Sequence, residues 1–161
     1  MDRDGTLNYD CPYCKNADEI KLYDDIFEPI KELSKDFYII IITNQSGIAK
    51  GYFKEQDLTK MHEKIKSEIA SKGGRIDAIY YCPHNSGECK CRKPKLGMLK
   101  CAIEDFDINL SKSFMVGDKD VDIEFAKNAK IRWIRVRDRG QKNDLPYAEN
   151  FYEVLEIIKN S

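Results

Sequence analysis

The stretch that decides the fold is the beginning of the chain, Met1-Asp2-Arg3-Asp4-Gly5-Thr6-Leu7-Asn8. In an extended segment, side chains alternate between two faces, so Asp2 and Asp4 point to one side and Arg3 to the other. Gly5 lets the backbone bend sharply where a strand ends. Two close carboxylates are unfavourable in a dry site unless a cation neutralises them or one takes a proton. The stretch therefore predicts a Mg²⁺ site, or a nucleophile paired with an acid/base.

Two other structures share this pattern of residues. Calcium-binding loops also use D-x-D-G, but an EF-hand needs a Glu at its twelfth position, and counting from Asp2 that position holds Tyr13. We therefore exclude an EF-hand. A polar surface turn remains an alternative at this point, and the residues further along the chain decide between a turn and a catalytic site.

The composition is that of one soluble domain. The 161 residues suffice for a hydrophobic core, so we treat residues 1–161 as a single domain. The net charge of −1 is spread along the chain, which predicts neither nucleic acid nor membrane as a partner. No apolar run approaches the ~20 residues of a membrane span, and we expect no signal peptide. The six cysteines are clustered, which favours metal chemistry in a reducing compartment and a cytoplasmic location.

Helical and strand-like patterns alternate along the chain. This alternation predicts an α/β fold with a mostly parallel sheet, whose catalytic residues gather at the carboxyl ends of the strands. The apolar runs predict strands at Phe37–Ile42, Ile76–Tyr81, Phe114–Val116 and Ile131–Val136. The helical periodicity predicts a helix capped by Asp24 or Asp25 with Ile26, Ile30 and Leu33 inward, a helix at Glu55–Lys72, one with Leu99, Ile103 and Phe106 inward, and two more at Asp120–Ala129 and Tyr152–Ile158.

Polar residues follow the expected strands. Thr43 and Asn44 end the first, Arg92 and Lys93 come after the loop that follows the second, and Asp118 follows the third. We expect these side chains to meet near the carboxylate pair, at one edge of the sheet. Taken singly, Thr43-Asn44 could be a strand-end cap, Lys93 a solvated lysine and Asp118 a helix N-cap. Each alternative explains one residue alone, whereas a single site explains all of these residues together. We therefore favour a single site.

This set of residues suits phosphoryl transfer. Asp2 and Asp118 would hold Mg²⁺, which neutralises phosphate oxygens and lets a carboxylate approach them. Asp2 would attack phosphorus to form an aspartyl phosphate, while Asp4 protonates the leaving alcohol and then deprotonates the hydrolytic water. The pair Thr43-Asn44 and Lys93 would bind the transferring group through donors and positive charge.

The same motifs, in the same order, define the haloacid-dehalogenase superfamily of phosphatases. They are Asp2-x-Asp4-Gly5-Thr6, Thr43 after an apolar strand, Lys93, and Gly117-Asp118 with Asp122. The longer matches at residues 2–8, 43–52 and 91–98 resemble its family of heptose bisphosphate phosphatases, to which the histidinol-phosphate phosphatases are closely related. The resemblance covers nearly the whole chain.

The resemblance implies a Rossmann-like fold, a mostly parallel sheet flanked by helices without a large cap domain. It implies Mg²⁺-dependent hydrolysis through an aspartyl phosphate, with Asp4 also giving its backbone carbonyl to the metal held by Asp2 and Asp118. Lys119 and Arg92 would lie beside the site, with Arg92 reaching the substrate. The implied substrate is a small phosphorylated sugar, a heptose bisphosphate; the alternatives are histidinol phosphate or another small sugar phosphate. We expect a monomer.

A second cluster of metal-binding residues lies in the loop from Cys82 to Lys93. Cys82, His84, Cys89 and Cys91 provide three thiols and one imidazole, which fit a tetrahedral structural Zn²⁺. Members of the resembled family carry Zn²⁺ at this pattern. A loop without apolar anchors needs such a metal for order, and the ion would fix the residues that follow it at the site. A disulfide plus a free thiol is the alternative, which a reducing cytoplasm disfavours.

The remaining cysteines and histidine carry weaker signals. Cys11-Pro12-Tyr13-Cys14 is the redox sequence of glutaredoxins, but no helical pattern follows it, as such a site requires. We expect loop cysteines without a catalytic role, and keep a redox protein and a zinc-stabilised binding module without catalysis as rival functions. A second metal half-site at these cysteines is a further alternative. His62 is expected to be a solvated or partly packed helix residue.

The expected fold lacks one strand. In this fold the first Asp ends a buried central strand, but only Met1 precedes Asp2. Without a strand of about five residues, two neighbouring strands would expose unpaired edges in the middle of the sheet. We therefore expect the natural protein to start upstream, with a short Val/Ile/Phe-rich run leading into Met1. The alternatives are that another segment fills the gap, or that the chain is a weakened form.

Overall fold

The computed structural model describes residues 1–137 and 146–161. The strands are β1 (Ile40–Asn44), β2 (Ala78–Cys82), β3 (Phe114–Gly117), β4 (Arg132–Val136) and β5 (Tyr147–Ala148). The α-helices are α1 (Phe27–Leu33), α2 (Glu55–Ser71), α3 (Gly97–Asp105), α4 (Asp120–Ala129) and α5 (Phe151–Lys159). Short 3₁₀ turns occupy Ala17–Glu19, Asp24–Ile26 and Leu110–Lys112. Among the described helices, none is long and apolar enough to cross a membrane.

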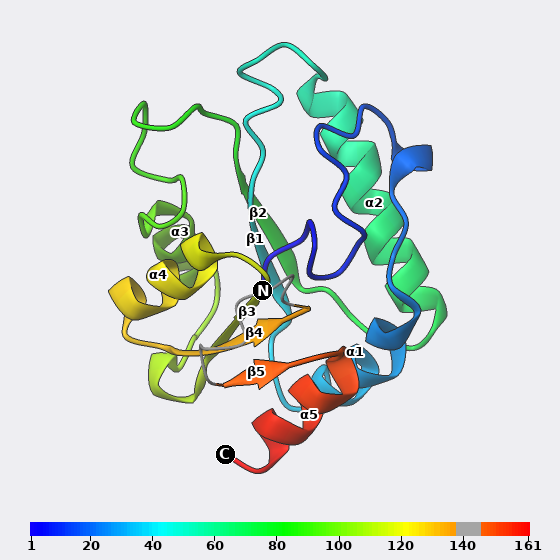
Figure 1. Cartoon of the computed structure of the whole chain (residues 1–161), viewed down its shortest axis with the longest axis vertical. Coiled ribbons are helices and arrows are strands. Elements are labelled where there is room, and N and C mark those ends of the chain that lie inside the picture. The colour runs from blue at the N-terminus through cyan, green and yellow to red at the C-terminus, as the bar shows by residue number, and fades with distance from the viewer. Residues whose placement is uncertain (138–145) are drawn as a thin grey trace.

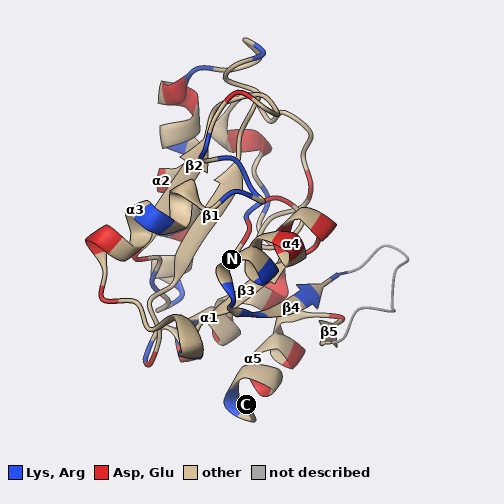
Figure 2. Cartoon of the chain, turned by 90° about the vertical axis from the view of Figure 1, so that its left-hand side faces the viewer, with Lys and Arg blue, Asp and Glu red and all other residues tan. Residues whose placement is uncertain are grey.

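The strands form two parallel sheets that flank the start of the chain. β1 pairs with β2, while β3, β4 and β5 form the second sheet in that order. Met1 pairs with β1, because its amino group donates to Ile40 O (2.8 Å) and its carbonyl oxygen accepts the N–H of Ile42 (2.9 Å). Asp2 pairs with β3, because its backbone N–H donates to Val116 O (2.9 Å). Both views place the N-terminus between β1 and β3 (Figures 1 and 2).

Helices cover both faces of the strands. Successive residues of a strand point to opposite faces, and so Ile41 packs with the α1, α2 and α5 core while Ile42 packs with the α3 and α4 core. Figure 1 shows α3 and α4 on one side of the strands and α2, α1 and α5 on the other. The predicted α/β fold, Rossmann-like with flanking helices, is confirmed, and a large cap domain is not evident in the described residues.

Two local predictions about helices were wrong. Neither Asp24 nor Asp25 caps α1; they lie in a 3₁₀ turn before it, and Asp25 accepts the N–H of Phe151 (3.0 Å) instead. Ile103 was expected to face inward from α3, but it is 42% exposed, and the buried face consists of Met98, Leu99 and Ala102. A backbone contact at Gly97, whose N–H donates to Lys90 O (3.1 Å), fixes where α3 starts.

The predicted strands exist with shifted ends. β1 begins at Ile40 and not at Phe37, because the N–H of Phe37 still bonds to Leu33 O and closes the end of α1. Two residues further on, Ile39 N donates to the Asp77 carboxylate (2.7 Å) and not to a strand. Of residues 37–39 only Ile39 is buried and Tyr38 is 54% exposed, so the apolar run extends beyond the strand.

Candidate active site

A buried lysine between two carboxylates forms the centre of the site. Lys93 Nζ lies 2.7 Å from Asp2 Oδ1 and 2.6 Å from Asp122 Oδ1, and all three side chains are buried. The end of β1 holds Lys93 in place, because Asn44 Oδ1 accepts the N–H of Lys93 (2.9 Å) and Asn44 Nδ2 donates to Lys93 O (3.2 Å). Residues from four separate segments thus meet at the carboxyl ends of the strands, as predicted.

The charges in this cluster depend on one another. Burial raises the pKa of Asp2 to about 7, although the positive charge of Lys93 opposes the shift. Burial would lower the pKa of Lys93, but the negative charges of Asp122 and Asp2 outweigh it and raise that pKa. Lys93 therefore stays protonated, and its charge is what keeps two buried carboxylates tolerable side by side.

Asp4 is held by several donors at once. The Arg3 guanidinium spans both carboxylate oxygens at 2.8–3.1 Å, Asn8 Nδ2 donates to Oδ1 (2.9 Å) and Gln45 Nε2 donates to Oδ2 (2.7 Å). Burial raises the pKa of Asp4, but the charge and hydrogen bonds of Arg3 outweigh it, so the net shift is downward. The sequence suggested that Arg3 turns away from the site; in the structure it reaches round to Asp4.

His62 supports Arg3 from helix α2. Its Nε2 lies 3.3 Å from Arg3 Nη1, and only 9% of the residue is exposed. Burial lowers the pKa of His62 to about 3, so the ring is neutral and can accept the Arg3 N–H. The prediction of a solvated or partly packed His62 was wrong, because nothing in the α2 sequence showed that a buried arginine would need an acceptor there.

Asp118 lies near Asp2, against the turn formed by Gly5 and Thr6. Thr6 Oγ1 donates to Asp118 Oδ1 (3.2 Å). Gly5 has φ +84°, and a Cβ there would lie 2.2 Å from Asp118 Oδ2, so only glycine fits. Carboxylate oxygens of Asp2, Asp118 and Asp122 lie within 4.8 Å of one another. Such an all-oxygen set suits Mg²⁺.

An open cavity of about 300 Å³ adjoins the carboxylates. Asp4, Asp10 and Lys119 line it, together with residues 11–13 and 44–47. Lys119 Nζ lies 3.5 Å from Asp4 O, 3.7 Å from Asp10 Oδ1 and 3.9 Å from Asp118 Oδ2. A phosphate group entering here would meet the Lys119 charge beside Asp4 and Asp118.

The two substrate-binding candidates Thr43 and Arg92 are placed differently. Thr43 is buried, and its hydroxyl accepts Gln45 Nε2 (2.9 Å). Arg92 does not line the cavity; its Nη1 donates to His84 O (3.2 Å). At the rim of the cavity, the hydrogen bond from Lys50 lowers the pKa of the Tyr13 hydroxyl, and the positive charge of Arg92 adds a smaller effect in the same direction.

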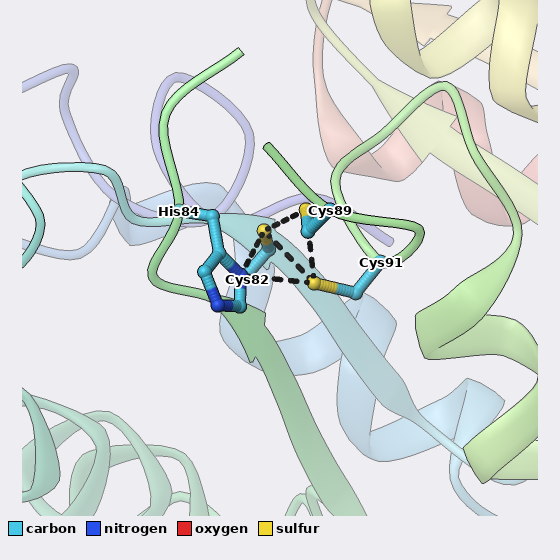
Figure 3. Close-up of side chains that lie close together, drawn as sticks. All are labelled: Cys82, His84, Cys89 and Cys91. Carbon is cyan, nitrogen blue, oxygen red and sulfur yellow. Dashed lines mark hydrogen bonds between the residues drawn. The ribbon is translucent and has the colours of Figure 1, made fainter. Parts of the chain in front are cut away.

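The predicted metal-binding cysteines and histidine come together. Ligand atoms of Cys82, His84, Cys89 and Cys91 lie within 4.8 Å of one another, with Cys91 Sγ 3.1 Å from Cys82 Sγ and 3.3 Å from His84 Nδ1. Figure 3 shows the four side chains pointing to a common centre. Arg92 N donates to Cys89 Sγ (3.3 Å) and helps lower the pKa of that thiol to about 6, against the upward effect of desolvation. The donor set fits Zn²⁺.

The other cysteine pair is oxidised. Cys11 and Cys14, which were expected to be loop cysteines without a catalytic role, form a disulfide. The pair is three residues apart, and the chain between them turns tightly enough for Cys14 N to donate to Cys11 O (3.2 Å). Local turn geometry therefore brought the two thiols together, which the spacing alone did not indicate.

Comparison with known proteins identifies the family. A family model described as polynucleotide kinase 3 phosphatase matches residues 2–138. The D-glycero-alpha-D-manno-heptose-1,7-bisphosphate 7-phosphatase of Campylobacter jejuni is 38% identical over 162 aligned positions, which cover 99% of this chain and 94% of that protein. The chain belongs to the heptose bisphosphate phosphatase family of the haloacid-dehalogenase superfamily. It is a phosphatase.

Two further members of the heptose bisphosphate phosphatase family bear on the site. The D-glycero-beta-D-manno-heptose-1,7-bisphosphate 7-phosphatase of Haemophilus influenzae is 43% identical over 140 positions, covering 82% of this chain and 76% of that protein. The D,D-heptose 1,7-bisphosphate phosphatase of B. bronchiseptica has a crystal structure, in complex with magnesium and phosphate. It superposes with a TM-score of 0.88 at 32% identity, covering 99% of this chain and 97% of that one.

Several residues that build the site were not among the sequence candidates. Asp122 appeared only as part of a motif, yet it shares Lys93 with Asp2. Asn8 and Gln45 bind Asp4; Gln45 directly follows the candidate Asn44, and Asn8 ends the stretch that begins at Asp2. The sequence signal for such residues is a polar side chain within or next to a strand-end motif. That signal does not show which of these side chains turns toward the site.

Proposed function

We propose that this phosphatase removes the 7-phosphate of D-glycero-D-manno-heptose 1,7-bisphosphate, acting as a monomer in the cytoplasm with Mg²⁺ at its active site. The observation that carries the proposal is the buried Lys93 shared by Asp2 and Asp122, next to Asp118 and an open cavity. The family relationship supports the same chemistry, because relatives along most of the chain carry this activity in their names.

In the proposed mechanism, Asp2 attacks phosphorus and becomes an aspartyl phosphate. Asp2, Asp118 and the backbone carbonyl of Asp4 would hold Mg²⁺, which supplies positive charge to the phosphate oxygens when bound. Lys93 keeps the Asp2 side chain in place and adds a second positive charge. Thr43 and Asn44 shape the pocket for the transferring group at the end of β1.

Asp4 would first have to take up a proton against the downward pKa shift caused by Arg3; it would then give that proton to the leaving alcohol and take one from the attacking water. We expect Asp4→Asn to form the phosphoenzyme slowly and to block its hydrolysis, because an amide cannot accept the water's proton. The loss in steady-state turnover should be about 10²–10⁴-fold. Acid-quenched protein should then carry covalent phosphate that persists when substrate is removed. Turnover like that of the unaltered protein would contradict this role.

Zn²⁺ in the cysteine cluster would hold the loop that carries Arg92 and Lys93. Metal analysis should find about one Zn²⁺ per chain. Cys89→Ser should lower the zinc content, the melting temperature and the activity, because the loop then loses a ligand. Cys101→Ser is the matched control, since that thiol is free, exposed and outside the cluster. Full activity in a protein with no bound zinc would show that the metal does not order the loop.

The substrate assignment rests on the family relationship, because the charges around the cavity are mixed. Lys119 lines the cavity together with Asp4 and Asp10, and Lys50 donates to the Tyr13 hydroxyl at its rim. The two lysines would attract a second phosphate, and the two carboxylates would attract the ammonium group of histidinol. The test is a panel of both heptose bisphosphate anomers, histidinol phosphate and a heptose monophosphate. A higher kcat/KM for histidinol phosphate than for both bisphosphates would overturn the substrate assignment.

The disulfide leaves a redox function as the second candidate. Cys11 and Cys14 form the C-P-Y-C bridge beside the cavity. A thiol–disulfide exchange assay on the unaltered protein and on Cys11→Ser separates the two functions. We expect no exchange activity above background in either protein, and phosphatase activity in both.

A further inference from the structure

A buried arginine and a buried histidine lie behind the carboxylate of Asp4. Arg3 is 2% exposed and His62 is 9% exposed, and neither residue lines the active-site cavity. One edge of the Arg3 guanidinium, formed by Nε and Nη2, donates to both carboxylate oxygens of Asp4. The remaining nitrogen, Nη1, lies 3.3 Å from His62 Nε2. The guanidinium is therefore bound on two sides, by the proposed acid/base and by a histidine outside the cavity.

The contact between Arg3 and His62 has a defined direction. An arginine has only N–H donors, so His62 Nε2 is the acceptor and the ring proton lies on Nδ1. Burial and the neighbouring Arg3 charge lower the pKa of His62 to about 3, which keeps the ring neutral. Because a guanidinium is planar and rigid, an acceptor at Nη1 also fixes the plane in which Nε and Nη2 donate to Asp4.

The position of His62 is fixed by its helix and by the sheet. The other buried residues of α2 are apolar, namely Leu58, Met61, Ile65 and Ile69. The His62 ring packs against the Tyr81 ring of β2, with centroids 5.9 Å apart. A leucine in this place would continue the apolar face of α2, so packing does not by itself require a histidine. The ring instead matches the Nη1 donor of Arg3 that Asp4 does not use.

The side chains that hydrogen-bond to the Asp4 carboxylate are all N–H donors among the described residues. They belong to Arg3, Asn8 and Gln45, at 2.7–3.1 Å. A carboxylate surrounded by donors is held in one orientation and in its deprotonated form, which is the form that takes a proton from water. Orientation matters for such a step, because a displacement of about 1 Å can lower a rate about 100-fold.

We propose that His62 is a positioning residue for the phosphatase reaction, because it fixes Arg3 and, through Arg3, the orientation of Asp4. The inference rests on the proposed role of Asp4 as the acid/base. It concerns the second half of the reaction, in which the water oxygen bonds to phosphorus, the bond from phosphorus to the Asp2 carboxylate oxygen breaks, and the water proton goes to Asp4. His62 lies outside the cavity and acts only through its contact with Arg3.

Two substitutions of His62 test the proposal in the full chain. His62→Leu removes the acceptor and should lower kcat about 10–100-fold, while KM changes less than about twofold. Because hydrolysis is the slowed step, a larger fraction of the acid-quenched protein should carry covalent phosphate. His62→Gln places an amide oxygen near the position of Nε2 and should restore most of the lost kcat. Met61→Leu, on the same buried face of α2, is the matched packing control.

The proposal fails if His62→Leu keeps kcat within about twofold of the unaltered protein. It also fails if His62→Leu lowers kcat without raising the amount of covalent phosphate, or if the leucine and glutamine substitutions lower kcat equally.

A double variant keeps the test valid if His62→Leu folds poorly. Arg3→Met combined with His62→Leu replaces both buried polar partners by apolar ones, so the melting temperature should recover. The kcat should stay as low as in Arg3→Met alone, because without Arg3 the residue at position 62 has nothing to position. Recovery of kcat together with the melting temperature would show that His62 serves the fold only, contrary to the proposal.

The Asp4→Asn protein separates this inference from the proposed role of Asp4. Full turnover in Asp4→Asn would overturn both. A large loss of turnover in Asp4→Asn with none in His62→Leu would overturn the positioning role of His62 alone and leave the role of Asp4 intact.

Discussion

Replacing Asp2 by asparagine should reduce kcat at least about 10⁴-fold, the order of loss seen when a covalent nucleophile is removed. An amide is a poor nucleophile and a weaker Mg²⁺ ligand. The change should not unfold the protein, because burial already raises the pKa of Asp2 to about 7 and the Lys93 charge is still shared with Asp122. Steady-state phosphate release from the heptose bisphosphate measures the effect.

The control for this change is Asp36→Asn, which alters an exposed carboxylate in the turn after α1. It should leave kcat unchanged within about twofold. The melting temperature of the Asp2→Asn protein should stay within a few degrees of the unaltered protein. If Asp2→Asn retains more than about a tenth of the activity, another group performs the attack, and the role given to Asp2 is wrong.

Lys93→Met should have the largest effect on stability as well as a large effect on activity. It leaves Asp2 and Asp122 buried with no cation between them, and removing one partner of a buried ion pair costs about 3–5 kcal/mol. We expect that loss in urea unfolding with chelator present, and at least about a 10³-fold loss in kcat. Lys100→Met, on an exposed lysine of α3, is the matched control.

A double variant separates the two roles of Lys93. In Lys93→Met with Asp122→Asn, one of the two buried negative charges is gone, so part of the lost stability should return. Activity should not return, because the positive charge beside Asp2 is still missing. Recovery of both stability and activity would show that Lys93 serves the fold alone.

The sequence predicted which candidate residues come together better than it predicted the groups that hold them. The candidates Asp2, Lys93 and Asp118 meet as expected, because the residues after parallel strands share one edge of a sheet. The metal-binding loop was equally predictable, since few structures other than a metal site bring three thiols and an imidazole together within ten residues. In both cases the residue types themselves are unusual, and their clustering follows from the sequence pattern alone.

The groups that hold these residues were not predictable in the same way. Arg3, Gln45 and His62 are ordinary polar residues in the sequence, and their contact with Asp4 or with one another depends on side-chain directions. Ile103 illustrates the opposite error, because helical spacing placed it on the buried face although α3 is covered on one narrow stripe only. Periodicity identifies an element, but the neighbouring elements decide how wide its buried face is.

The most direct test of the account is to trap the covalent intermediate. Protein mixed with the heptose bisphosphate and quenched with borohydride should yield homoserine in place of an aspartate, because borohydride reduces an acyl phosphate to the alcohol. The account predicts homoserine at position 2 of the amino-terminal peptide, by mass spectrometry, in the Asp4→Asn protein above all. Homoserine at another aspartate, or none while phosphate is being released, would contradict the claim that Asp2 carries the phosphoryl group.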